Sequence, residues 1–116
     1  MSALYQFDAD QAGSEESNDV LTVGVAKAFG PYFMIKRPLG KEKLSGDELY
    51  AEHDDQGKGA FGSLQHVELT REVFTAKLQD GTTIIASLKI DDDSWTKLKF
   101  DLLRALSGFD ELHTIK

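Results

Sequence analysis

The chain of 116 residues contains no cysteine, which excludes disulfide bonds, thiolate metal sites and cysteine nucleophiles. It also lacks any apolar run near the roughly 18 residues that a membrane-spanning helix needs. Its first residues show neither the basic start nor the apolar stretch of a signal peptide. We therefore expect a cytoplasmic protein that has no membrane partner.

Positive charge is scarce as well, with 13 lysines and arginines against 20 aspartates and glutamates, a net charge of -7. Binding to nucleic acid depends on concentrated positive charge, so this balance argues against a nucleic-acid partner. A basic protein, in contrast, would be attracted and its association accelerated. The same acidity could equally serve solubility alone, and the charge does not decide between the two.

The length fits one domain, and an apolar fraction of 41% is enough for a core of its own. We predict a single domain over residues 1–116, with a partly flexible N-terminal segment at 1–19 and a core at 20–106. Within that segment, Gln11–Asp19 is polar and has no large apolar residue, so an exposed loop is expected there.

Alternation of apolar and polar residues predicts strands along most of the chain. An Asp80-Gly81 pair predicts a hairpin between the last two of them. A loop is expected over Arg37–Asp47, which contains Pro38, Gly40 and Gly46. The predicted strands are Ala3–Asp8 at an edge, Val20–Ala26, Tyr32–Lys36, Glu48–His53, Leu64–Thr70, Val73–Leu78 and Thr83–Ile90.

The last predicted element is an amphipathic helix from Asp92 to Ser107. The preceding Asp91 can cap it, and Gly108 can end it. An apolar stripe at helical spacing comprises Trp95, Leu98, Leu102 and Leu106. The sequence thus predicts an α+β fold: an antiparallel sheet of about six or seven strands, with a meander in the second half and the helix packed on one face.

The middle of the chain, Glu52–Leu69, has the most distinctive composition. Three glycines, Gly57, Gly59 and Gly62, surround Phe61 and predict a turn of defined shape. A calcium loop is disfavoured, because glycine and lysine occupy the ligand positions. A phosphate cradle is disfavoured too, because a strand follows instead of a helix.

No pattern predicts catalysis or a bound cofactor. His53, His66 and His113 match no metal-ligand spacing. The serines lack a recognisable nucleophile motif. We therefore expect a protein that is not an enzyme and that binds neither metal nor cofactor.

Two aromatic residues lie where burial is not expected: Phe61 in the glycine turn, and Phe100 about 140° around the helix from Trp95. Each could pack against a neighbouring loop, or each could anchor a partner beside an acidic rim. On the second reading the aspartates supply charge, the glutamine supplies hydrogen bonds and the aromatics anchor. The predicted partner-binding residues are Asp54, Asp55, Gln56, Phe61 and Phe100.

The run YAEHDDQGKGAFGSLQHVELTREVFTAKL at Tyr50–Leu78 resembles the immunity protein 10 family of bacterial polymorphic toxin systems. Similar to that family are its acidic DDQ, its glycine-aromatic-glycine turn and its VELTRE strand and turn. The stretches LTVGVA at Leu21–Ala26 and LKIDDDSWTKLKFDLLRAL at Leu88–Leu106 resemble the family's opening strand and closing helix. The resemblance implies a small cytoplasmic protein that binds a cognate toxin domain, often a nuclease, and blocks it without catalysis.

Two other functions remain open from the sequence. A small acidic secretion chaperone or adaptor would dimerise and expose a large apolar helix face to its client. An enzyme would need a pocket lined with paired titratable groups. The sequence does not decide the oligomeric state or identify the toxin.

Overall fold

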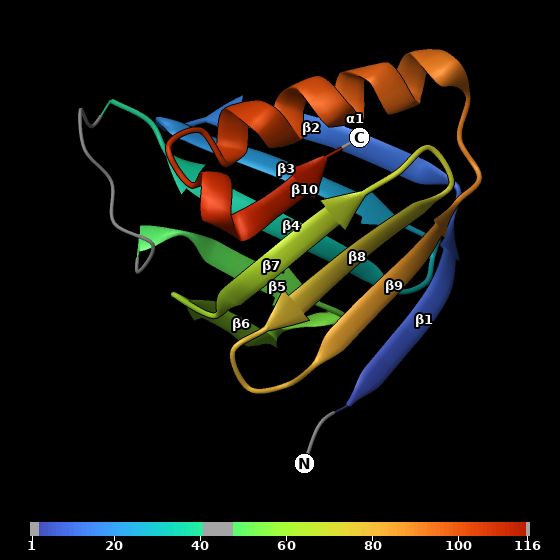
Figure 1. Cartoon of the computed structure of the whole chain (residues 1–116), viewed down its shortest axis with the longest axis horizontal. Coiled ribbons are helices and arrows are strands. Elements are labelled where there is room, and N and C mark those ends of the chain that lie inside the picture. The colour runs from blue at the N-terminus through green and yellow to red at the C-terminus, as the bar shows by residue number, and fades with distance from the viewer. Residues whose placement is uncertain (1–2, 41–47, 116) are drawn as a thin grey trace.

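The computed structural model of the protein describes residues 3–40 and 48–115, without the side chains of residues 55–58. This part of the chain forms ten strands, one α-helix and a short 3-10 helix (Figure 1). The elements are β1 (Leu4–Ala9), β2 (Gln11–Ser17), β3 (Val20–Ala26), β4 (Tyr32–Pro38), β5 (Tyr50–His53), β6 (Asp55–Phe61), β7 (Leu64–Leu69), β8 (Val73–Leu78), β9 (Thr83–Leu88), α1 (Asp92–Ala105), η2 (Asp110–Leu112) and β10 (His113–Ile115).

The strands divide into two sheets of five. Sheet A has the order β1-β9-β8-β7-β10, and sheet B has the order β2-β3-β4-β5-β6. The β1–β9 and β10–β7 pairs are parallel, and all the other pairs are antiparallel. The α+β class, the meander of β7, β8 and β9, and the edge position of β1 are therefore confirmed. The strands form two sheets where the sequence predicted one.

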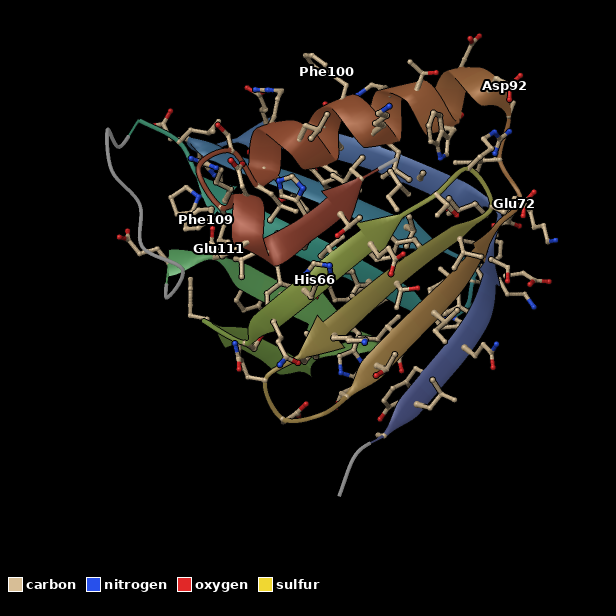
Figure 2. All side chains as sticks on the ribbon, viewed as in Figure 1. His66, Glu72, Asp92, Phe100, Phe109 and Glu111 are labelled. Atoms are coloured by element: carbon tan, nitrogen blue, oxygen red, sulfur yellow. The ribbon has the colours of Figure 1, made fainter. Side chains whose placement is uncertain are left out.

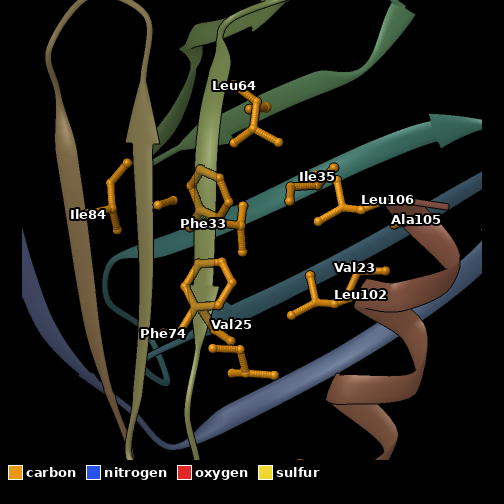
Figure 3. Close-up of a cluster of buried hydrophobic side chains, with 14 of the residues drawn as sticks. Val23, Val25, Phe33, Ile35, Leu64, Phe74, Ile84, Leu102, Ala105 and Leu106 are labelled. Carbon is orange, nitrogen blue, oxygen red and sulfur yellow. The ribbon is translucent and has the colours of Figure 1, made fainter. Parts of the chain in front are cut away.

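Sheet B forms one layer of the molecule, and sheet A and α1 together form the other (Figure 1). Phe33 of β4 meets Phe74 of β8 between the sheets, with ring centroids 5.5 Å apart. Beside them, Leu102 of α1 and Leu106, the C-cap of that helix, face Val23 and Ile35 of sheet B (Figure 3). The inner face of sheet B is thus covered by sheet A and by α1, and no element of the described residues covers its outer face.

Period-two burial follows from this arrangement, because successive side chains of a strand point to opposite faces. Strand β3 alternates strictly, with Leu21, Val23 and Val25 buried and the residues between them partly exposed. The buried apolar residues form one cluster. It contains Ala9, Leu21, Val23, Val25, Phe33, Ile35, Leu49, Ala51, Leu64, Val67, Leu69, Phe74, Ala76, Leu78, Ile84, Ala86, Leu88, Leu98, Leu102, Ala105, Leu106 and Phe109.

The helix begins and ends close to where the sequence predicts. The backbone N–H of Ser94 donates to the carboxylate of Asp91 at 2.7 Å, which caps the helix. Past the C-terminus, Gly108 takes a positive φ of 88°, a conformation that glycine adopts without steric cost. The amphipathic helix packed on one face of a sheet is confirmed.

A buried carboxylate attaches α1 to the edge strand β2. Asp101 is only 4% exposed and accepts hydrogen bonds from Ser14 Oγ at 2.6 Å and Lys97 Nζ at 2.8 Å. Burial by itself raises the pKa of Asp101, but these hydrogen bonds and the nearby positive charges outweigh it, so the pKa lies below its usual value. Arg104 and Glu16 add an ion pair at 2.5 Å. Polar contacts therefore fix the helix on this side.

The segment Gln11–Ser17 is strand β2, so the prediction of a loop there is wrong. Its backbone pairs with β3 over its whole length, from Gln11 opposite Ala26 to Ser17 opposite Val20. Because β2 is an edge strand covered by polar contacts to α1, it forms without large apolar side chains. The hydrophobic pattern alone could not reveal it.

Most of the glycine-rich stretch forms strand β6, so the prediction of a turn around Gly57 and Gly59 is wrong. Gly59 lies in this strand directly beneath the phenol of Tyr50, which occupies the space that a Cβ would need. Only Gly62, with φ of 68°, belongs to the turn that follows. The glycine at 59 therefore serves a close approach of side chain to backbone. The predicted loop after β4 falls mostly on residues 41–47, outside the described residues, while Arg37 and Pro38 belong to β4.

Candidate protein-binding surface

The outer face of sheet B carries an unusual row of small residues. Gly13 of β2 lies opposite Gly24 of β3, which in turn lies opposite Met34 of β4. One pair further along, Ala26 lies opposite Tyr32. Small side chains on the first strands and large ones on β4 make this face concave.

The concavity is a groove with a volume of about 580 Å³. Gly13 and Gly24 lie along it, and Phe29, Tyr32 and Met34 supply its large side chains. The other lining residues are Gln11, Ala12, Ser14, Glu15, Thr22, Val25, Ala26, Lys27, Gly30 and Phe33. The lining is mostly apolar, as is usual for sites that accept a side chain or a small molecule.

The two glycines of the groove have different reasons to be glycine. A Cβ on Gly24 would come within 2.6 Å of the backbone oxygen of Phe33, so the fold itself requires glycine there. A Cβ on Gly13 would meet nothing within 4 Å. No packing contact among the described residues therefore explains the absence of a side chain at Gly13, which keeps the groove open.

The turn between β3 and β4 places an aromatic side chain in solvent at the end of the groove. Phe29 is fully exposed and has φ of 58°, a left-handed conformation that is uncommon for residues other than glycine, asparagine and aspartate. The turn is closed by Gly30 N–H donating to Lys27 O at 2.9 Å. It is also held by Ala28 N–H donating to the carboxylate of Asp10 at 3.0 Å.

A buried carboxylate stabilises the centre of the same face. Glu52 of β5 is only 4% exposed and accepts hydrogen bonds from the hydroxyls of Tyr32 and Tyr50, the latter at 2.7 Å. The hydrogen bond to Glu52, together with burial and the carboxylate's charge, raises the pKa of Tyr50 above its usual value. Both phenol rings are thereby held in fixed positions.

A second hollow of about 280 Å³ lies beyond Tyr50. Phe61 at the end of β6 is 69% exposed and stands edge-on to Tyr50, with ring centroids 5.1 Å apart. The ammonium of Lys36 lies 5.6 Å from the centre of the Tyr50 ring. Val20, Pro38 and Glu48 complete the lining. The outer face of sheet B thus bears an exposed phenylalanine beside each of two hollows.

The residues predicted to bind a partner do not form one group. Phe61 lies on the outer face of sheet B, as just described. Asp54 lies at the opposite end of β6, at a bend where its φ is 64° and its Oδ2 is 3.8 Å from His53 Nδ1. Seven strand residues at about 3.3 Å each put roughly 20 Å between these two ends.

Phe100 is 62% exposed and projects from α1 away from both sheets (Figure 2). It therefore lies on the other layer of the molecule from Phe61. Asp55 and Gln56 belong to β6, and their side chains are outside the described residues. The structure does not unite the acidic pair, Phe61 and Phe100 into one patch.

Apart from Phe61, the residues that shape this surface were missed by sequence reasoning. Tyr50 and Glu52 belong to a predicted strand, but their two-residue spacing on one face did not stand out from ordinary alternation. The sequence around Phe29 reads Phe-Gly-Pro, a turn signal that marks the residue as exposed. Gly13 was hidden in a segment interpreted as loop.

The histidines do not form a cluster of three. His66 Nε2 is 3.2 Å from Thr114 Oγ1, and the ring of His53 packs against Tyr5 with centroids 4.8 Å apart. Across residues 3–40 and 48–115, no three histidine, aspartate or glutamate side chains gather in a way that could hold a metal ion.

Comparison with known proteins does not identify a function for this surface. The chain matches no family model, and no curated protein is significantly similar to it in sequence. Among the described residues, no helix has both the length and the apolar character to cross a membrane.

Proposed function

We propose that this chain is a bacterial immunity protein, which binds a cognate toxin domain in the cytoplasm and blocks it without catalysis. The sequence resemblance at Tyr50–Leu78 and Leu88–Leu106 suggests this function. The partner in this proposal is a basic toxin, for which a nuclease is one candidate, because the chain itself carries a net charge of -7.

The structural observation that supports the proposal is the outer face of sheet B. It exposes Phe29 and Phe61 on one face, beside hollows that no part of the described chain fills. Aromatic side chains that become buried in pockets of the complex are common anchors of protein–protein interfaces. The hydrogen bonds from Tyr32 and Tyr50 to Glu52 hold both side chains in place before binding. Less side-chain entropy is therefore lost when a partner binds this face.

A chaperone of the dimeric kind would present the apolar face of its helix. Here Leu98, Leu102 and Leu106 are buried against the sheets, and only Phe100 and Leu103 remain exposed among the large apolar residues of α1. No observation on the helix favours a client-binding groove. The burial of the apolar helix face therefore favours the immunity function over the chaperone function.

The decisive experiment is expression of the C-terminal domain of the protein encoded beside this chain, with and without this chain, in a bacterial host. We expect that domain to stop growth and this chain to restore it, and the two to copurify as a complex. Growth arrest that this chain does not relieve, or relief without any complex, contradicts the proposal. The matched control is the same host carrying the chain with an early stop codon.

A further inference from the structure

We propose that the groove along Gly13 and Gly24, together with Phe29, is the docking surface for a basic partner protein. The partner lays an apolar side chain in the groove and receives Phe29 in a hollow of its own. This inference rests on the proposed function and adds to it the place and chemistry of the contact.

Phe29 is the first argument, because its position has a conformational cost and no packing gain. The residue adopts a positive φ, which strains the backbone of any side chain with a Cβ. It is also fully exposed, so its ring gains no hydrophobic stabilisation from burial within this chain. Asparagine or glycine would fit the same turn with less strain. An aromatic residue in this position is explained by a contact outside the chain.

The emptiness of the groove is the second argument. Gly13 has room for a side chain, and an edge strand gains stability from a β-branched or aromatic residue at such a place. Glycine therefore costs stability at this position while it leaves the groove deep. Met34 and Tyr32 give the groove large apolar walls, and Tyr32 is held by Glu52. The groove is thus preformed for an apolar group.

Charge at this end of the molecule is the third argument. The parallel strands β1 and β9 end side by side, with Ala9 opposite Leu88, so the aspartates after each strand lie at one edge. The turn that carries Phe29 is tied to the same edge through Asp10. Glu72 and Asp92 also lie here (Figure 2), and Leu88 N–H donates to Glu72 O at 2.8 Å.

Acidic groups outnumber basic ones at this edge. Arg71 is engaged by Asp92 at 2.8 Å, and its guanidinium faces the ring of Trp95. The ammonium of Lys99 lies 5.4 Å from the centre of the same ring, and Lys27 and Lys89 also lie near this edge. The exposed carboxylates of this edge are those of Asp8, Asp10, Glu72, Asp91, Asp92 and Asp93. A basic partner would be attracted and oriented toward Phe29 by this field.

Two substitutions test the docking surface without removing a stabilising contact. Phe29→Asn keeps a residue that tolerates positive φ and deletes the ring. Gly13→Leu fills the groove from a position where a Cβ meets no atom within 4 Å. We expect both variants to unfold at a urea concentration no lower than that of the parent chain.

Binding is measured with the purified C-terminal domain encoded beside this chain, by surface plasmon resonance. We expect each variant to bind about 30-fold more weakly, the usual effect of losing an interface anchor. Gly13→Ala should give a smaller loss than Gly13→Leu, because it fills less of the groove. The comparison variant is Phe100→Gln, which removes an exposed ring from the other layer of the molecule. If the contact lies on the groove, this variant binds as tightly as the parent chain.

The outcomes separate the two proposals. If the parent chain binds and both variants bind equally well, the docking surface is wrong and the immunity function stands. If Phe100→Gln weakens binding and the two variants do not, the contact lies on the helix. If the parent chain neither binds nor protects, the immunity function fails and this surface fails with it.

A separate experiment tests whether the partner is basic. Replacing Asp8 and Glu72 by lysine should slow association about tenfold at low salt and leave dissociation unchanged, because steering acts on the encounter rate. An unchanged association rate, or a partner domain with a net negative charge, overturns the electrostatic part of the proposal.

Discussion

At the scale of single residues, the most informative group is the carboxylate of Glu52. It is buried on a sheet face that otherwise meets solvent, and two phenol hydroxyls donate to it. Hydrogen bonds to a charged acceptor are worth more than neutral ones, about 1.5–3 kcal/mol each. A carboxylate in this position therefore orders both tyrosines, which border the two hollows.

The first prediction concerns Tyr50 and its pKa. The raised pKa means that the stabilising contribution of this hydroxyl is complete below its ordinary pKa of 10.0 and is lost as pH rises from there through the folded-state pKa. Replacing Glu52 by glutamine should bring the pKa of Tyr50 back toward 10.0. Ultraviolet titration of tyrosine absorbance measures this, and Tyr50→Phe identifies the signal. A late-titrating tyrosine that persists in Glu52→Gln contradicts the assignment.

The second prediction compares the two glycines of the groove. Gly24→Ala should lower the free energy of unfolding by about 1–3 kcal/mol, since the new methyl group is forced against the backbone of Phe33. Gly13→Ala should leave it unchanged or raise it by about 0.5 kcal/mol, because the added Cβ lowers the entropy of the unfolded chain. Urea unfolding at pH 7 measures both. Equal effects at the two positions would show that the groove is not shaped as described.

At the scale of elements, the join between α1 and sheet B combines an apolar stripe with polar contacts in the C-terminal half of the helix. Asp101 meets Ser14 on β2, while Arg37 of β4 donates to the backbone oxygens of Ala105 at 3.0 Å and Ser107 at 2.6 Å. The oxygen of Ala105 is among the carbonyls that a helix leaves unpaired at its C-terminus, and Ser107 follows the C-cap Leu106. These contacts hold the helix against both β2 and β4 and so set its orientation on sheet B.

The third prediction tests this join through Asp101. Asp101→Asn should lower the free energy of unfolding by about 2 kcal/mol at pH 7, because a buried acceptor loses its charge-assisted hydrogen bonds. The lowered pKa of Asp101 means that its contribution is present above the ordinary value of 3.8 and is lost as pH falls below it, through the folded-state pKa. The variant should therefore show a weaker loss of stability in acid.

Chemical unfolding between pH 7 and pH 2.5 measures that difference. A suitable control is Asp93→Asn, an exposed residue in the first turn of the same helix, which should cost only a few tenths of a kcal/mol. If the parent chain and Asp101→Asn lose stability in parallel as the pH falls, Asp101 is not the group responsible.

At the scale of the whole molecule, net charge and the placement of exposed aromatics determine how a partner would approach. The chain carries -7, and many of its exposed carboxylates lie at the edge where β1 and β9 end. Charge of one sign steers association over distances comparable with the Debye length, about 8 Å at physiological salt. The aromatic anchors then decide how long the complex lasts.

The fourth prediction returns to the acidic pair in the middle of the sequence. Neutralising Asp54 and Asp55 together to asparagine should slow association with the proposed toxin partner by about threefold at low salt and by less at 0.15 M salt. Asparagine tolerates the positive φ of Asp54, so the bend is retained. Stopped-flow association at several salt concentrations measures the effect. A rate that stays the same at every salt concentration removes these aspartates from the binding surface.

Much of the fold could be read from local pattern. The helix with its Asp91 cap and the hairpin at Gly81 follow from neighbours in the chain, and both are confirmed. Strand β2 could not be predicted, because it is held by backbone pairing with β3 and by polar residues of α1. Ser14 and its partner Asp101 are 87 residues apart in the sequence. Strand β6 was obscured by its glycines, of which Gly59 leaves the space that the phenol of Tyr50 occupies.

The sequence by itself determined the strands with a buried apolar face, the single amphipathic helix and the acidic charge, because periodicity and composition are local properties. Only the tertiary structure decided which sheet face stays uncovered. That depends on sheet A and α1 sharing the inner face of sheet B, which leaves Gly13, Gly24 and Phe29 together on the outer side. These residues are brought together by strand pairing and not by sequence spacing, and so no local pattern could predict the groove.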